Sequence, residues 1–258
     1  MKERKVAVVT GGADGIGSGI VSRLSSEGMI VAIVDKDEKK AKIKAEEITA
    51  SGNEAKAFHC DLSRPEEIEA VFDKIIEAFG RIDVLINNAG VGGYLSWQDM
   101  SMEEWHRFTS VNCDAAFLCV QRAAKEMIQR KIQGDIILVL SQAALNQDET
   151  IVVPYGVSKW GERGLMRSAA SALRKYGIAV NGICPGTVWT PMMDGFCQEY
   201  LDAGSGTKEE YLAFIESKYP LNRIQTAEDM ANMCLFLLRD GHHMSGQTLP
   251  VAGGIIFS

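Results

Sequence analysis

A tyrosine and a lysine four residues apart, Tyr155 and Lys159, form the pair in this chain best suited to chemistry. In a helix, positions i and i+4 lie on the same face, one turn apart. An ammonium group held there favours phenolate over phenol and lowers the pKa of a tyrosine from about 10. Such a tyrosine can give and take a proton near neutral pH, as general acid–base catalysis requires. The same spacing also arises by chance, with a half-buried tyrosine beside a surface lysine, so other features must separate the two interpretations.

A glycine-rich turn near the N-terminus suits a cofactor that carries phosphates. The sequence VVTGGADGIG closes a β-branched run and opens a helical pattern, with Gly-x-x-x-Gly-x-Gly spacing. Glycines permit a tight turn, let the backbone approach a pyrophosphate and aim the amides of a helix N-terminus at it. We expect cofactor contacts at Gly11, Asp14, Gly15, Ile16 and Gly17. The alternative is a tight turn that binds nothing.

Asp35 ends the second predicted strand, twenty residues after Gly15. A carboxylate at that place accepts hydrogen bonds from a ribose hydroxyl and repels a 2′-phosphate. We therefore predict that the cofactor is NAD(H) in preference to NADP(H). Lys36 follows directly and could relax that preference.

Three further segments follow predicted strands, at the edge of a parallel sheet where ligands collect. They are Asp61 and Leu62 after the third strand, Asn88, Ala89 and Gly90 after the fourth, and Pro185, Gly186, Val188 and Thr190 after the sixth. The first segment could hold an adenine ring, and the last could meet a nicotinamide carboxamide. The asparagine side chain either bridges strands beside the cofactor or satisfies loop backbone groups.

The elements that must position these residues alternate along the chain. Strands are predicted at Lys5–Val9, Ile30–Val34, Ala55–His59, Val84–Ile86, Asp135–Leu140 and Ile178–Ile183. Amphipathic segments lie at Gly17–Glu27, Asp37–Ala50, Pro65–Phe79, Glu103–Gln129 and Tyr155–Lys175. This alternation predicts an α/β fold of βαβ units with a parallel sheet covered by helices on both faces. The near-continuous apolar character of the strands fits burial on both sides.

Length and composition favour one domain spanning residues 1–258. No linker or repeat divides the chain, in which we expect a cofactor half at about 1–140 and a catalytic and substrate half at about 141–258. The loosest stretch, at about 190–220, is interpreted as a lid over the site. The net charge of -7 argues against a nucleic-acid or anionic-membrane partner. Six cysteines without CxxC pairing fit reduced thiols in a cytoplasmic protein, and no metal site is predicted.

The motifs, taken in order, resemble those of the short-chain dehydrogenase/reductase family. The matching segments are TGGADGIG at 10–17, NNAG at 87–90, Ser110 to Asn112, Ser141, Tyr155 with Lys159, Pro185-Gly186 and GQTLPVAGG at 246–254. The resemblance runs nearly from end to end. It implies a Rossmann-type doubly wound sheet of about seven parallel strands and hydride transfer between NAD and an alcohol or carbonyl compound.

The resemblance also implies a role for each catalytic residue. Tyr155 would be the general acid and base, and Lys159 would lower the pKa of Tyr155 and bind the nicotinamide ribose. Ser141 would hydrogen-bond the substrate oxygen, and Asn112 would support Lys159 through a water-linked proton relay. In the family, the helices at 103–129 and 155–175 build dimer interfaces, and so a homotetramer with D2 symmetry is expected.

The chain departs from the family at the serine, which in most relatives lies one position later, where this chain has Gln142. Either Gln142 has replaced the serine, or the following loop is one residue longer. We favour Ser141, because the strand Asp135–Leu140 delivers it, loops absorb an insertion readily, and an amide cannot hand on a proton as a hydroxyl can. Gln142 is then either a substrate contact or a residue of the loop surface.

The substrate is predicted from the branch of the family that the chain resembles, which holds acetoin reductases and sorbitol-type polyol dehydrogenases. We expect a small polyol, ketose or hydroxyketone. Five apolar or aromatic side chains could line its pocket, or only pack: Tyr94, Trp189, Met192, Met193 and Phe196. The same lining would suit a hydroxysteroid, and a sorbitol-6-phosphate type of substrate would need basic residues, for which only Lys208 and Lys218 qualify. A non-catalytic NAD-binding regulator is the alternative from another class.

Overall fold

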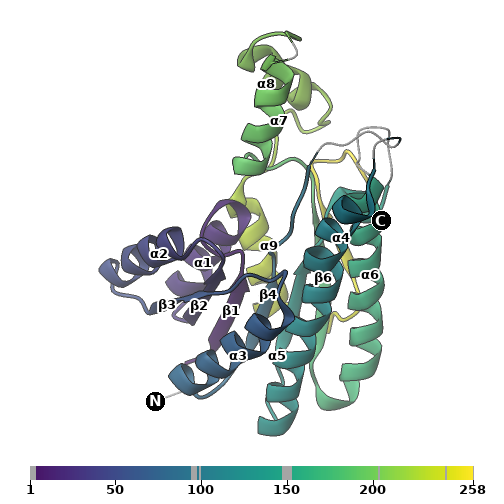
Figure 1. Cartoon of the computed structure of the whole chain (residues 1–258). Helices are drawn as coiled ribbons and strands as arrows, with labels where there is room; N and C mark the ends of the chain where they lie inside the picture. The colour runs from purple at the N-terminus through teal and green to yellow at the C-terminus, as the bar shows by residue number, and fades with distance from the viewer. Residues whose placement is uncertain are drawn as a thin grey trace.

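A seven-stranded parallel sheet forms the centre of the computed structural model, which describes residues 4–93, 98, 100–146, 153–202, 204–241 and 243–257. The strands are β1 Val6–Thr10, β2 Ile30–Asp35, β3 Ala55–His59, β4 Val84–Asn87, β5 Asp135–Val139, β6 Ala179–Pro185 and β7 Thr248–Val251. Their order in the sheet is β3-β2-β1-β4-β5-β6-β7 (Figure 1). The chain order reverses between β1 and β4, and ligands of doubly wound folds bind at such a switch point. The predicted fold class is confirmed.

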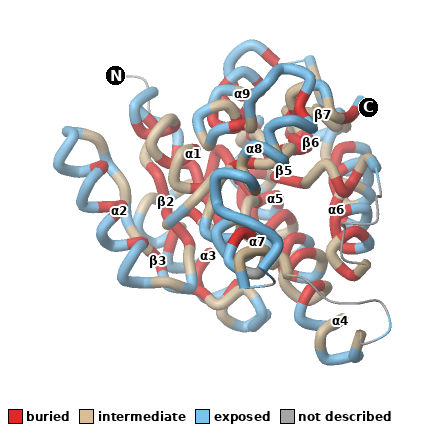
Figure 2. The backbone as a smooth tube through the Cα atoms, turned by 90° about the horizontal axis from the view of Figure 1, so that it is seen from above, coloured by how far each residue is buried: buried red, intermediate tan, exposed pale blue. Residues whose placement is uncertain are grey.

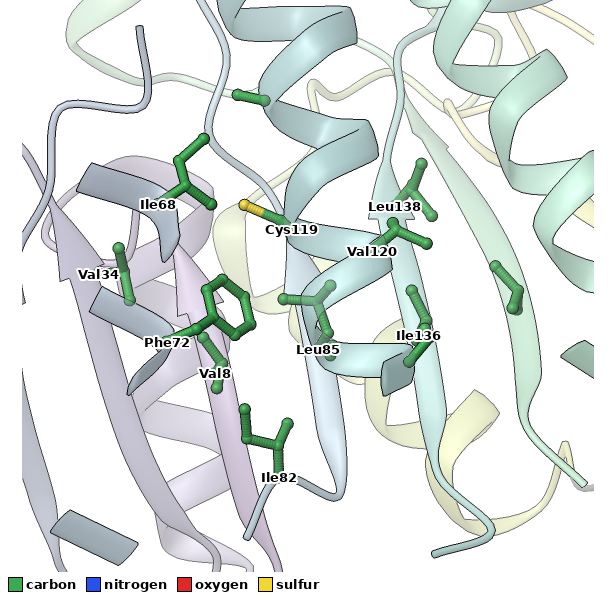
Figure 3. Packing of buried hydrophobic residues seen from close by; sticks show 14 of the residues in the cluster. Val8, Val34, Ile68, Phe72, Ile82, Leu85, Cys119, Val120, Ile136 and Leu138 are labelled. Carbon is green, nitrogen blue, oxygen red and sulfur yellow. The ribbon is translucent and has the colours of Figure 1, made fainter. Parts of the chain in front are cut away.

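Helices cover both faces of the sheet. One face is covered by α3 Pro65–Phe79, α5 Ala116–Arg130 and α6 Val153–Leu173, and the other by α1 Gly15–Ser26, α2 Glu38–Ala50 and α9 Ala227–Arg239. Val8 of β1 belongs to the first core, where Figure 3 shows it near Phe72 of α3, whereas Val9 belongs to the second. Because strand side chains alternate and both faces are covered, every residue of β1 is buried.

Capping residues set where several of these helices begin. Asp14 caps α1 by accepting a hydrogen bond from the Gly15 amide, and Pro65 stands in the first turn of α3. The sequence analysis missed α9, although Thr226 and Asp229 form a capping box at its start. None of the described helices combines the length and the apolar character that crossing a bilayer requires.

The long helical segment predicted at Glu103–Gln129 is divided in the structure. It consists of α4 Met102–Thr109, a π-helical turn η1 at Ser110–Ala115, and α5. A π turn inserts one residue into the helical ladder and is often found at functional sites. Asn112 lies within this turn and is completely buried.

The stretch interpreted as a lid contains two helices, α7 Pro191–Asp202 and α8 Lys208–Ser217. A capping box between Thr207 and Glu210 starts α8, and the rings of Tyr200 and Tyr211 pack across the two helices at 5.0 Å. The helices stand above the carboxyl ends of the strands (Figure 1), and the view from above shows that α8 is largely exposed (Figure 2). The glycines of this stretch, Gly195, Gly204 and Gly206, favoured the prediction of a loose segment, although the capping box indicates a helix.

Candidate active site

The glycine-rich turn joins β1 to α1 in a backbone conformation that needs glycine. Gly11 and Gly15 have φ values of 61° and 52°, which side-chain-bearing residues rarely adopt. A Cβ atom on Gly17 would overlap the carbonyl oxygen of Gly11. The first-turn amides of a helix have no acceptor within the helix, and here they lie at the carboxyl edge of the sheet, where they can donate hydrogen bonds to a pyrophosphate.

Asn88 holds this turn from the neighbouring strand. Its Nδ2 atom donates hydrogen bonds to the carbonyl oxygens of Thr10 and Gly11, both at 3.0 Å. The Thr10 hydroxyl in turn accepts hydrogen bonds from the backbone amides of Asn88 and Ala89. Both sequence interpretations of Asn88 therefore hold in part, because its amide bridges β1 and β4 by satisfying loop carbonyls.

Asp35 is fixed by two backbone amides at the end of β2. One carboxylate oxygen accepts a hydrogen bond from Ala13 at 3.1 Å, and the other accepts one from Asp37 at 3.0 Å. Each oxygen keeps a lone pair that a ribose hydroxyl can use. The carboxylate is thus oriented by the glycine-rich turn itself.

A hollow of about 580 Å³ lies beside Asp35, and acidic groups predominate in it. Its lining consists of Lys36, Asp37, Glu38, His59, Asp61, Arg64 and Glu67. The Arg64 guanidinium is paired with Glu67 at 2.9 Å. Asp61 accepts hydrogen bonds from the backbone amide and hydroxyl of Ser63, which lower its pKa, and Leu62 packs against the core.

Residues far apart in the sequence lie close together at the carboxyl edge of the sheet. A Cβ atom on Gly15 would meet the Thr190 methyl group at 3.1 Å, and one on Gly90 would lie 3.4 Å from the Lys159 Nζ atom. Gly186, after β6, is similarly enclosed by Tyr219 and Gln225. The glycine positions and the oriented Asp35 fit a dinucleotide whose phosphates would lie at the start of α1.

Tyr155 and Lys159 occupy successive turns at the start of α6. The Lys159 Nζ atom lies 5.8 Å from the centroid of the Tyr155 ring, and the lysine is only 3% exposed. Lys159 also donates a hydrogen bond to the Val139 carbonyl, at the end of β5, at 3.2 Å. The structure therefore brings the tyrosine–lysine pair to the end of the strand that precedes Ser141.

Ser141 follows β5 directly and caps a short 3-10 turn, η2 Gln142–Ala144. Its hydroxyl accepts a hydrogen bond from the Ala143 amide at 3.1 Å. The backbone amide of Ser141 interacts with the Cys184 thiol on β6. Within the described residues, the Gln142 Oε1 atom is buried without a hydrogen-bond partner, so this side chain has an unused acceptor beside Ser141.

The Asn112 side chain ties the loop after β4 to α6. Its Nδ2 atom donates to the Ser158 hydroxyl at 2.9 Å and to the Val91 carbonyl at 3.1 Å, while its Oδ1 atom accepts from the Val91 amide at 2.8 Å. This bonding fixes the helix turn that carries Lys159. The water-linked relay implied by the family resemblance stays a prediction.

The predicted substrate contacts fall around the base of the lid. The Trp189 indole donates to the Asp194 carboxylate at 3.0 Å, and the Met192 side chain lies against Gly92. Tyr219, which is buried, donates to the Thr187 hydroxyl at 2.6 Å and anchors the end of the lid. Met193 is partly buried in α7. Tyr94 and the side chain of Phe196 lie outside the described residues.

Glu162 is a charged residue of the site that the sequence analysis missed. It is 1% exposed, and its two carboxylate oxygens lie 3.1 and 3.0 Å from the Lys159 Nζ atom. Burial raises the pKa of Glu162 to about 7, although the lysine charge opposes this shift. Burial alone would lower the pKa of Lys159, but Glu162 and Tyr155 outweigh it and the pKa is raised. The i,i+3 spacing of Lys159 and Glu162 could have suggested that they form an ion pair, but it could not show that the ion pair is buried.

Comparison with known proteins identifies the family. The model of the short chain dehydrogenase family matches residues 5–200. The chain belongs to this family. Its members are oxidoreductases that bind nicotinamide cofactors, and the predicted family membership is confirmed.

Three relatives illustrate the range of this similarity. A short-chain dehydrogenase/reductase of Armillaria gallica is 35% identical over 260 residues, covering 100% of this chain and 98% of its own. The diacetyl reductase [(S)-acetoin forming] of Staphylococcus epidermidis is 31% identical over 256 residues, with 98% and 99% coverage. The crystal structure of an actinorhodin polyketide ketoreductase variant with NADPH superposes with a TM-score of 0.93 at 30% identity, covering 99% and 98%.

Proposed function

We propose that this chain transfers hydride between NAD(H) and a secondary alcohol or ketone, with a small polyol, ketose or hydroxyketone as substrate. The observation that carries the proposal is the position of Lys159, which joins the Tyr155 turn of α6 to the end of β5 next to Ser141. A buried ammonium beside a phenol and a hydroxyl, at the sheet edge that carries the glycine-rich turn, is an arrangement for acid–base chemistry on a substrate oxygen.

In this proposal Tyr155 and Ser141 act on the substrate oxygen, and Lys159 and Asn112 act through other residues. The nicotinamide, when bound, supplies hydride to a carbonyl carbon or takes it from an alcohol carbon. Tyr155 gives its phenolic proton to the carbonyl oxygen during reduction and takes it back during oxidation. Ser141 donates a hydrogen bond to the same oxygen, and Lys159 favours the phenolate form of Tyr155. Asn112 keeps the Lys159 turn in place through Ser158.

The choice of NAD(H) is supported by the charges around Asp35. A 2′-phosphate would meet this carboxylate and a hollow whose lining includes Asp37, Glu38, Asp61 and Glu67. Lys36 is the opposing feature, because its exposed ammonium could pair with a phosphate. The actinorhodin ketoreductase was crystallised with NADPH, so the cofactor preference needs a direct test.

The substrate class is supported by the relationship to a diacetyl reductase and by the pairing of the basic residues of the lid. Lys208 lies 3.9 Å from Asp194 and 5.0 Å from the Trp189 ring, and Lys218 lies over the Phe214 ring. The Asp194 carboxylate offsets part of the Lys208 charge, which disfavours a substrate phosphate beside it. The apolar side chains of the lid would also suit a steroid ketone, which is the alternative substrate.

A substrate panel tests the proposal. NADH fluorescence is followed during incubation with diacetyl, acetoin, ketoses, a ketose phosphate, a steroid ketone and a β-ketoacyl thioester, and the reverse reaction is run with alcohols and NAD. We expect the small diketone or hydroxyketone to be reduced with the highest kcat/KM. NADH binding without turnover across the whole panel would contradict the proposal and favour a regulator.

The homotetramer remains part of this proposal. Phe117 on α5 and Val157 and Trp160 on α6 are large apolar side chains that are almost half exposed. Such residues favour a helix-to-helix interface between copies. Size-exclusion chromatography with light scattering should give a mass four times that of the chain, and a monomer at micromolar concentration would contradict this part.

A further inference from the structure

Glu162 is a buried carboxyl group that the proposed chemistry does not use. It lies one turn beyond Lys159 on α6, and both of its oxygens contact the Lys159 ammonium. The ammonium has a third contact with the Val139 carbonyl. Glu162 and Val139 therefore hold Lys159 from two elements, α6 and β5, and fix where its charge lies relative to Tyr155.

Few other charges reach this pair. Glu162 interacts with Lys159 of α6, with Cys113 of η1 and with Cys184 of β6. One step further out, Tyr155 acts on Lys159, Asp114 acts on Cys113, and Arg163 acts on Cys184. Burial raises the pKa of Cys113 to about 11 and that of Cys184 to about 12, so both thiols stay neutral near pH 7. Among the described residues, Glu162 is thus the carboxyl group in direct contact with the Lys159 ammonium.

The effect of such a neighbour follows from electrostatics. A positive charge near a phenol stabilises phenolate, and a negative charge at similar range opposes that stabilisation. The opposition is large in a buried site because few solvent dipoles screen it. If the carboxylate is removed while Lys159 stays, its negative charge no longer opposes the stabilisation of a Tyr155 phenolate by the Lys159 ammonium.

We propose that Glu162 is a positioning residue for the reaction: its carboxylate holds the Lys159 ammonium at the Val139 carbonyl and offsets its charge, which sets how readily Tyr155 releases its proton. This inference rests on the proposed role of Tyr155. Glu162 touches neither substrate nor cofactor in it, and acts only through Lys159.

The test titrates Tyr155 directly in the cofactor-free protein. Tyrosinate absorbance is recorded against pH for the wild-type chain and for Glu162→Gln, each with its own Tyr155→Phe background subtracted. We expect the Tyr155 midpoint to fall by about 1–2 pH units in Glu162→Gln, since one negative charge is lost at short range. The low-pH limb of kcat/KM for alcohol oxidation should move down by the same amount, and Glu162→Asp should move both midpoints back toward wild type.

Glu126→Gln is the matched control, because it removes another buried carboxylate, near the far end of α5. It should leave the Tyr155 midpoint unchanged. An unchanged midpoint in folded Glu162→Gln, or an equal shift in Glu126→Gln, would overturn the inference. If Glu162→Gln does not fold, Glu162→Met is titrated in the same way, and an unchanged midpoint there has the same meaning.

The titration also separates this inference from the proposed function. A Tyr155→Phe protein with wild-type turnover would refute the proposed function, whereas the absorbance experiment would still measure the coupling between Glu162 and Tyr155. A wild-type midpoint in both Glu162 variants, together with an inactive Tyr155→Phe protein, would refute the inference alone.

Discussion

Two carboxylates at the carboxyl edge of the sheet are held in opposite ways. Asp35 is only partly buried and is oriented by the backbone amides of Ala13 and Asp37, within its own βαβ unit. Glu162 is fully buried and is compensated by a side chain, Lys159, whose position depends on the packing of α6 against β5. In the proposed function the first carboxylate binds a ligand, whereas the second contacts another residue.

This difference separates a binding region from a chemical region. Around Asp35 and the glycine-rich turn, the geometry is set by local backbone conformation, so a substitution should change cofactor affinity or selectivity. Around Lys159, the geometry is set by contacts between elements, so a substitution should change proton transfer and its pH dependence while cofactor affinity stays near that of the wild type.

The largest expected effect is that of Tyr155→Phe, which removes the proton donor of the chemical region. We expect kcat to fall by about 10³-fold or more, while the Kd for NADH, measured by fluorescence titration, changes by less than about threefold. Tyr176→Phe, at an exposed tyrosine on the turn after α6, is the control and should behave as wild type. A Tyr155→Phe protein with turnover close to that of the wild type would show that Tyr155 is not the proton donor.

Gly17→Ala should have the next largest effect, and it should act on binding. The added methyl group collides with the Gly11 carbonyl, and such overpacking costs about 1–3 kcal/mol, or roughly ten- to a hundredfold in NADH affinity if the turn must shift. Gly195→Ala in α7, where a new Cβ atom has no neighbour within 4 Å among the described residues, is the matched control for affinity and melting temperature. Unaltered NADH affinity in a folded Gly17→Ala protein would contradict a phosphate-binding turn.

Asp35→Asn tests the selectivity of the binding region. Loss of the charge should lower the ratio of kcat/KM for NAD to that for NADP by about tenfold, because repulsion of a 2′-phosphate is relieved. Asp37→Asn is the control, because it removes a neighbouring carboxylate whose role is to cap α2. It should change the NAD to NADP ratio less than Asp35→Asn does. Equal ratios in the wild type and Asp35→Asn would show that other residues decide the cofactor.

The smallest expected effect is on stability, and it concerns Glu162. Its folded-state pKa of about 7 lies above the ordinary value of 4.5, so its favourable contribution is complete below pH 4.5 and is lost as the pH rises through 7. The melting temperature of the wild type relative to Glu162→Gln should therefore fall by a few degrees between these limits. A difference that is independent of pH would show that the carboxyl group titrates normally, as an exposed one does.

Much of the fold followed from local pattern. The six predicted strands agree with β1 to β6 to within a few residues, because β-branched runs buried on both faces leave a clear signal. The helices α7, α8 and α9 are absent from the sequence prediction, although capping boxes at Thr207 and Thr226 mark the starts of α8 and α9. Their mixed polar and apolar residues give a weak helical periodicity.

The order of the motifs, the glycine positions and the acidic residue after β2 could be predicted from the amino acids alone, since each depends on residues that are close along the chain. Three features come from the packing of distant segments: Lys159 bonds to Val139, Asn112 lies in a π turn bonded to Ser158 and Val91, and Glu162 is buried. Burial and contact between elements depend on how α6 and η1 pack onto the sheet. Helical spacing places Glu162 near Lys159, but only packing excludes water from the pair and makes its charges strong.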